Sequence, residues 1–103
     1  MIVIRVSFLW VDGMALFPFV LVRQANPPRW LLNHERIHLK QQLEMGLVLF
    51  YAWYLFEFLV RWLQHGNRSR AYRSISFERE AYKNDENLNY LQNRKFWAFL
   101  AYL

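Results

Sequence analysis

The sequence predicts an α+β fold in a single domain of residues 1–103, with an N-terminal β-hairpin followed by about three packed helices. The first quarter of the chain is β-branched and aromatic, as strands are, whereas the rest consists of longer apolar runs broken by Gly and polar linkers. With 103 residues the chain is too short for a second core, and with 55% hydrophobic residues it is too apolar to be disordered.

The predicted hairpin covers residues 2–23. Residues 2–11 and 14–23 are rich in Val, Ile, Leu and Phe, and Asp12-Gly13 between them is typical of a tight hairpin turn. Pro18 cannot donate a hydrogen bond to a neighbouring strand, so we expect an edge position or a bulge there.

Two helices are predicted next. After the break at residues 25–28, Ala-Asn-Pro-Pro, a helix begins near Trp30 and runs to Gln42, with Asn33 as an expected cap. Gly46 is an expected joint, and residues 46–63 form a second helix that is apolar on almost every face.

The second predicted helix carries Glu57 and Arg61 at the i,i+4 spacing of a helical ion pair. A polar linker at residues 65–70 follows, and a last helix is predicted over residues 76–93. The aromatic end, residues 96–103, is expected to pack back on the core, although a segment of this kind could instead cover a substrate cleft.

One short motif indicates metal chemistry. Residues 34–38 read His-Glu-Arg-Ile-His. On a helix, His34 and His38 share a face and can bind one metal ion, and Glu35 lies about 100° round the helix, where it can activate a water molecule. Two imidazoles leave Zn²⁺ short of protein ligands, so a third is needed. We expect His34 and His38 as zinc ligands and Glu35 as the general base.

The predicted helix over residues 76–93 offers two carboxylates for the third position, Glu78 and Glu80. The pattern His-Glu-x-x-His-x-x-Gln at 34–41, followed by Glu-x-Glu-Ala at 78–81, resembles the minigluzincins, soluble relatives of the catalytic cores of integral-membrane metallopeptidases. The resemblance implies a minimal zincin-like core, a glutamate as third zinc ligand, and hydrolysis of peptide bonds by a zinc-bound water that Glu35 activates.

The resemblance leaves two alignments open for the third ligand. The related membrane enzymes carry Glu-x-x-Ala-Asp, in which the Asp orients a histidine. Aligning on Ala81 selects Glu78 and puts Tyr82 where the Asp is expected. Aligning on a polar residue four positions after the ligand selects Glu80 and gives Asn84 the orienting role. We favour Glu78.

Peptide hydrolysis also needs a donor for the oxyanion and a place for the substrate. His65, Tyr72 and Tyr82 have suitable chemistry for the first, and their spacing does not choose between them. The resemblance implies that an extended peptide or protein substrate pairs with an edge strand, for which residues 14–22 are the candidate.

Composition limits the remaining partners. The net charge is +5, but no nucleic-acid motif accompanies the arginines near residues 61–73, so no nucleic-acid partner is expected. Residues 46–63 are almost as long as the ~20 residues of a membrane span, so binding to a membrane surface and self-association through this segment both remain open.

No signal peptide is expected, because Arg5 interrupts the first apolar run, which leaves a cytoplasmic or membrane-associated location. The alternative function is a zinc-binding scaffold with little or no turnover.

Overall fold

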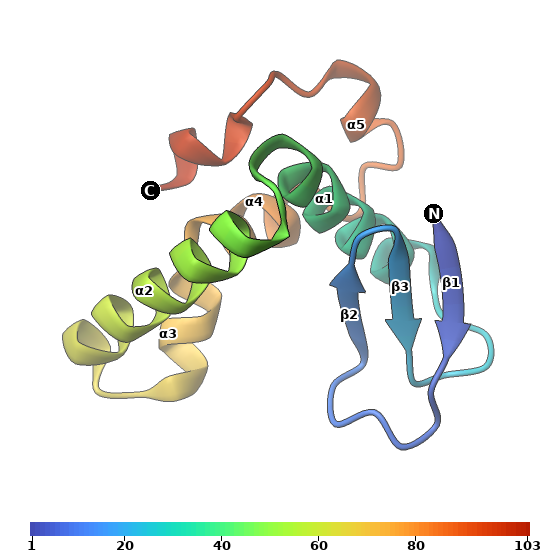
Figure 1. Ribbon diagram of the computed structural model, residues 1–103, viewed down its shortest axis with the longest axis horizontal. Coiled ribbons are helices and arrows are strands. Elements are labelled where there is room, and N and C mark those ends of the chain that lie inside the picture. The colour runs from blue at the N-terminus through green and yellow to red at the C-terminus, as the bar shows by residue number, and fades with distance from the viewer.

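The computed structural model describes all 103 residues as a three-stranded sheet followed by five α-helices and a C-terminal 3₁₀ helix (Figure 1). The α+β class is therefore confirmed, with more helices than predicted. The elements are β1 (Ile2–Arg5), β2 (Gly13–Leu16), β3 (Phe19–Val22), α1 (Arg29–Met45), α2 (Leu47–His65), α3 (Arg68–Ser74), α4 (Ser76–Asn84), α5 (Tyr90–Asn93) and the 3₁₀ helix (Ala98–Tyr102).

The sheet corrects the predicted hairpin over residues 2–23. Its order is β1-β3-β2, with β3 parallel to β1 and antiparallel to β2. The hairpin is formed by β2 and β3 alone and turns at Phe17-Pro18, where the missing N–H of Pro18 costs no ladder bond. Gly13, expected in the turn, is the first residue of β2, and β2 is an edge strand.

Helix α1 begins four residues before Asn33, so the prediction that Asn33 caps it is wrong. The two prolines at 27 and 28 hold the chain extended, and the helix starts directly after Pro28. The buried Asn33 amide instead donates to the carbonyl oxygens of Asp85 and Asn87, at 2.9 and 3.0 Å. This side chain joins the middle of α1 to the segment that follows α4.

The predicted joint at Gly46 is confirmed. Gly46 has φ 81° and ψ 152°, a conformation that only glycine adopts readily, and its N–H donates to Gln42 O at 2.7 Å. The chain turns sharply here, so that α2 leaves the end of α1 in a new direction (Figure 1).

The predicted ion pair between Glu57 and Arg61 is wrong. The buried Glu57 carboxylate accepts hydrogen bonds from the backbone N–H and the hydroxyl of Ser76, the first residue of α4, and from Trp53 Nε1 at 3.1 Å. It satisfies a free N–H at the start of a helix and complements the helix dipole. Arg61 bonds Gln64 instead.

The predicted helix over residues 76–93 is divided, because α4 ends at Asn84 and α5 is a separate turn. Asn and Asp between them favour turns over helix. The C-terminal segment packs back as expected: Phe99 is fully buried, and its ring centroid lies 4.6 Å from that of Phe77. Together with Met45, Phe50 and Ile75 these rings form the larger apolar cluster of the core.

Candidate metal centre and active site

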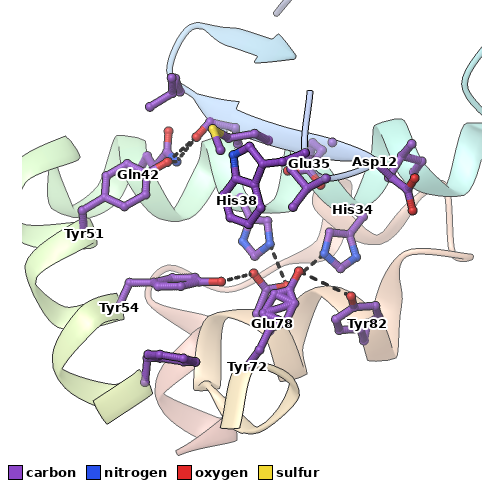
Figure 2. A pocket seen from close by; sticks show the side chains of 18 of the residues that line it. Asp12, His34, Glu35, His38, Gln42, Tyr51, Tyr54, Tyr72, Glu78 and Tyr82 are labelled. Atoms are coloured by element: carbon purple, nitrogen blue, oxygen red, sulfur yellow. Dashed lines mark hydrogen bonds and ion pairs between the residues drawn. The ribbon is translucent and has the colours of Figure 1, made fainter. Parts of the chain in front are cut away.

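Three buried side chains from two helices converge on one point (Figure 2). His34 and His38 come from α1 and Glu78 from α4, and all three are at most 5% exposed. Glu78 Oε1 lies 3.1 Å from His34 Nε2 and 3.2 Å from His38 Nε2. Ligand atoms around tetrahedral zinc lie about 3.3 Å apart. These two distances are close to that value, and all three atoms lie within 4.8 Å of one another.

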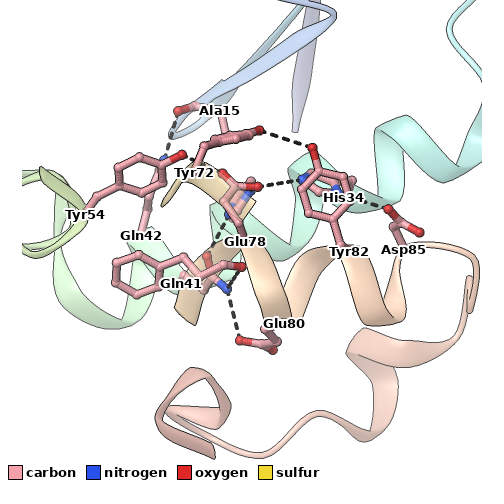
Figure 3. A network of polar contacts seen from close by, with 12 residues as sticks. Ala15, His34, Gln41, Gln42, Tyr54, Tyr72, Glu78, Glu80, Tyr82 and Asp85 are labelled. Carbon is pink, nitrogen blue, oxygen red and sulfur yellow. Dashed lines mark hydrogen bonds and ion pairs between the residues drawn. The ribbon is translucent and has the colours of Figure 1, made fainter. Parts of the chain in front are cut away.

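Each imidazole has a hydrogen-bond partner on the ring nitrogen that faces away from Glu78, and Figure 3 shows this for His34 and Asp85. Asp85 Oδ2 lies 3.0 Å from His34 Nδ1, and Gln41 Oε1 lies 2.8 Å from His38 Nδ1. Because both oxygens are acceptors, the ring proton of each histidine belongs on Nδ1. Both Nε2 atoms then face Glu78, and when the rings are neutral, as metal binding requires, their lone pairs are available to an ion, which is the arrangement that oriented metal-ligating histidines show.

Glu80, the alternative third ligand, lies elsewhere. Its carboxylate accepts from Arg94 Nε, from the Tyr90 hydroxyl at 2.7 Å and from Gln41 Nε2 at 3.0 Å. Gln41 Nε2 also donates to Phe77 O at 3.2 Å, so these contacts turn the amide oxygen of Gln41 toward His38. Glu80 therefore supports a histidine through Gln41, while Glu78 faces both imidazoles directly.

The two residues expected to orient an imidazole have different places. The Tyr82 ring packs edge-on against His34, with ring centroids 4.5 Å apart. Asn84 does not contact a histidine: its amide donates to Glu80 O and to the Tyr102 hydroxyl. Asp85 takes that role, and helical periodicity could have found it, because residues 78, 82 and 85 share one helix face.

Glu35 lines the cavity beside the two histidines and is almost fully buried. Burial raises the pKa of its carboxyl group, against the opposing effect of His38 and His34. A carboxylate with a raised pKa is the stronger base. Gly13 of β2 makes room for it, since a Cβ there would lie 3.2 Å from Glu35 Oε2.

The charge on the metal-free site is shared between His38 and Glu78. Burial disfavours the imidazolium of His38, but the adjacent Glu78 carboxylate outweighs it and raises the pKa of His38 to about 9. Burial opposes ionisation of Glu78 as well, yet the two histidines hold the pKa of Glu78 below its ordinary value. Without metal, His38 is therefore the cation of this buried pair at neutral pH.

A cavity of about 1160 Å³ opens beside His34, His38 and Glu78, between β2, α1, α2 and α3. Tyr54, Tyr72 and Tyr82 line it, and Tyr54 donates to Glu78 Oε2 at 2.7 Å. Burial raises the pKa of both Tyr54 and Tyr72, which keeps their hydroxyls as donors. Of the expected oxyanion donors, Tyr72 and Tyr82 lie here, whereas His65 is exposed and lies next to Ser74.

The outer edge of β2 is open along only part of its length. Gln42 Oε1 accepts from Phe17 N at 2.8 Å, and Gln42 Nε2 donates to Ala15 O at 2.9 Å, as a neighbouring strand would. Tyr51 also donates to Ala15 O. The candidate substrate strand, residues 14–22, is thus corrected: β3 is central in the sheet, and β2 is closed beyond Ala15, which leaves the stretch near Gly13 and Glu35.

The C-terminal segment does not line this cavity. Trp97 and Phe99 pack in the aromatic cluster beside Phe77 instead. The C-terminal segment therefore belongs to the core and does not cover the cavity.

No protein-family model matches the chain, and no curated protein or solved structure shows significant similarity to it. The geometry of its own residues therefore carries the functional assignment.

Proposed function

We propose that the protein is a zinc-dependent metallopeptidase with a minimal zincin-like core, in which His34, His38 and Glu78 hold the ion. The observation that carries the proposal is the orientation of both imidazoles by Asp85 and Gln41, which leaves two Nε2 atoms and one carboxylate oxygen facing each other in a buried site. Three protein ligands beside an open cavity are the pattern of a catalytic zinc site, since the fourth position stays free.

Zinc, when bound, lowers the pKa of its water and polarises the scissile carbonyl. Glu35 accepts the proton of the attacking water and passes it to the leaving amine, which its raised pKa favours. Tyr72, protonated at the cavity wall, is the candidate donor to the oxyanion, and Tyr82 lies against it with the two hydroxyls 3.4 Å apart.

The substrate that fits is a peptide with apolar side chains. The cavity is lined mainly by apolar and aromatic residues, including Trp30 and Phe58. The open part of the β2 edge near Gly13 offers main-chain pairing next to Glu35. Because Gln42 closes the edge beyond Ala15, pairing is restricted to a short stretch of the substrate.

The test compares zinc-loaded wild type with Glu35→Gln on quenched fluorescent peptides that have apolar residues around the scissile bond. We expect turnover by wild type, a loss of at least about a hundredfold in the variant, and one zinc in each. The matched control is Glu86→Gln, which makes the same carboxylate-to-amide replacement at an exposed position and should keep full activity.

The same comparison separates the alternative. Zinc in both proteins with no turnover in either identifies a zinc-binding scaffold. Equal turnover in wild type and Glu35→Gln contradicts the assigned role of Glu35.

A further inference from the structure

Helix α2 exposes an apolar stripe along almost its whole length. The stripe consists of Val48, Ala52, Leu55, Phe56, Leu59 and Leu63, all exposed. At 100° per residue these six fall within about 100° of arc and extend for about 22 Å. Val48 and Leu63, near its two ends, are 87% and 88% exposed, and the stripe carries no charged or hydrogen-bonding side chain.

Single exposed apolar residues are common on protein surfaces, but a continuous stripe without charges is not. A stripe of this kind therefore marks a docking site. Figure 1 shows α2 and α3 side by side, extending away from the sheet, so that the outer side of α2 is left uncovered. Only Phe50 and Glu57 of α2 are buried.

Helix α2 is long and apolar enough to cross a membrane. The residues on the side opposite the stripe nevertheless disfavour a membrane span. Glu57 lies there and is bonded to Ser76 in the protein. Alongside it runs α3, which carries Arg70 and Arg73. Insertion across a bilayer would carry these charges into the hydrocarbon core. A helix with one apolar face and charges behind it lies in the plane of the membrane surface.

Charge indicates the chemistry of the occupant. Arg68, the first residue of α3, is exposed at the C-terminal end of α2, where its guanidinium lies 6.0 Å from the Trp62 ring, and the net charge of the chain is +5. Cationic side chains beside an apolar face complement anionic headgroups above acyl chains.

We propose that the stripe of α2 docks the protein peripherally on an anionic phospholipid bilayer. The docking itself is independent of zinc. Its consequence for the cavity rests on the proposed function: Leu55 belongs both to the stripe and to the cavity wall, and the exposed Trp10 lines the same cavity. The cleft therefore opens at the lipid surface and takes apolar peptide segments that lie in the interface.

The test is co-sedimentation of the full chain with two kinds of vesicle, one of phosphatidylcholine alone and one that also contains about 30% phosphatidylglycerol. Each is measured with and without zinc. We expect binding to the anionic vesicles in both metal states, weakened by high salt. Phe56→Glu, at a position 69% exposed, should weaken binding at least about tenfold. Leu88→Glu, at an apolar position off α2 that is 49% exposed, is the control and should bind as wild type.

Circular dichroism checks that each variant is folded, which the exposure of both positions favours. Three results would overturn the proposal: no binding of wild type to anionic vesicles, equal binding of wild type and Phe56→Glu, or retention after alkaline carbonate washing, which indicates a span. A concentration-dependent dimer that Phe56→Glu dissociates, without vesicle binding, would assign the stripe to a second copy. Because binding is read without hydrolysis, failure of the peptidase assignment would leave this result unaffected.

Discussion

Asp85 and Gln41 decide which nitrogen of each histidine is available. A neutral imidazole can place its proton on either ring nitrogen, and only the Nδ1–H form presents Nε2 to a metal ion here. Asp85 accepts from His34, and Gln41, itself oriented by Glu80, accepts from His38. Metal binding at the proposed centre would therefore depend on residues that do not touch the ion.

Replacing Asp85 by Asn tests this dependence. Asn can present either oxygen or nitrogen to His34, so the ring is less firmly held and the basicity of Nε2 falls. We expect zinc affinity to drop about 10- to 100-fold, measured by competition with a chromophoric chelator. Glu86→Gln next to it is exposed and should bind zinc as wild type does. An unchanged affinity in Asp85→Asn would contradict the orienting role.

The pair of His38 and Glu78 makes the stability of the metal-free protein depend on pH. The pKa of His38 is raised from 6.5 to about 9, so its stabilising contribution is complete below pH 6.5 and is lost as pH rises through about 9. The pKa of Glu78 is lowered, so its contribution is present above pH 4.5 and is lost as the pH falls further.

We therefore expect the urea midpoint of the metal-free protein to be lower at pH 9 than at pH 6. His65→Gln, which removes an exposed histidine away from the site, should show the same decline. A midpoint that stays constant or rises over this range would contradict the charged pair.

At the scale of elements, α1 carries the two histidines and Glu35. The rest of the fold positions α4, with Glu78, and β2, with Gly13, against α1. The helical motif at residues 34–38 could be predicted because the i,i+4 spacing is local. The sheet order could not, since β1 pairs with β3 through a contact between distant residues, and Asp12-Gly13 is an equally good turn locally. The role of Glu57 was missed for the same reason: Arg61 is near in sequence, but Ser76 is near in space.

The turn at Gly46 sets the direction of α2 and can be tested against a second glycine. Gly46→Ala forces a side chain into a conformation that only glycine adopts readily, and we expect unfolding to become easier by about 1–3 kcal/mol. Gly66 has φ 64° and ψ 17°, a left-handed conformation in which Ala costs only about 1–2 kcal/mol. Urea denaturation of both variants measures the difference. A smaller loss for Gly46→Ala than for Gly66→Ala would contradict the observed turn.

At the scale of the whole molecule, a chain of buried polar contacts links the C-terminal segment to the metal centre. Arg94 bonds Glu80 and Glu44, Glu80 bonds Gln41, and Gln41 bonds His38. This network joins α1, α4 and the segment after α5 in a protein that buries only 24 of its 103 residues. With so small a core, a bound ion should contribute a large share of stability.

Zinc should therefore stabilise the fold as a whole. At free zinc about 1,000 times the dissociation constant, the gain is about 4 kcal/mol, which raises the melting temperature by many degrees. Thermal denaturation with and without zinc measures it. Magnesium is the control and should produce no comparable shift, because two imidazoles suit zinc and not magnesium. A melting temperature indifferent to zinc would count against a centre in the folded protein.

The most direct test of the metal centre is zinc content by elemental analysis of folded wild type, His34→Gln, Glu78→Gln and Glu80→Gln. The last two replace carboxylates of the same helix by the same amide. At saturating zinc we predict one zinc per chain in wild type and in Glu80→Gln, which keeps all three proposed ligands, and none in His34→Gln or Glu78→Gln. Zinc retained by Glu78→Gln and lost from Glu80→Gln, or absent from wild type after reconstitution, would contradict the centre described here.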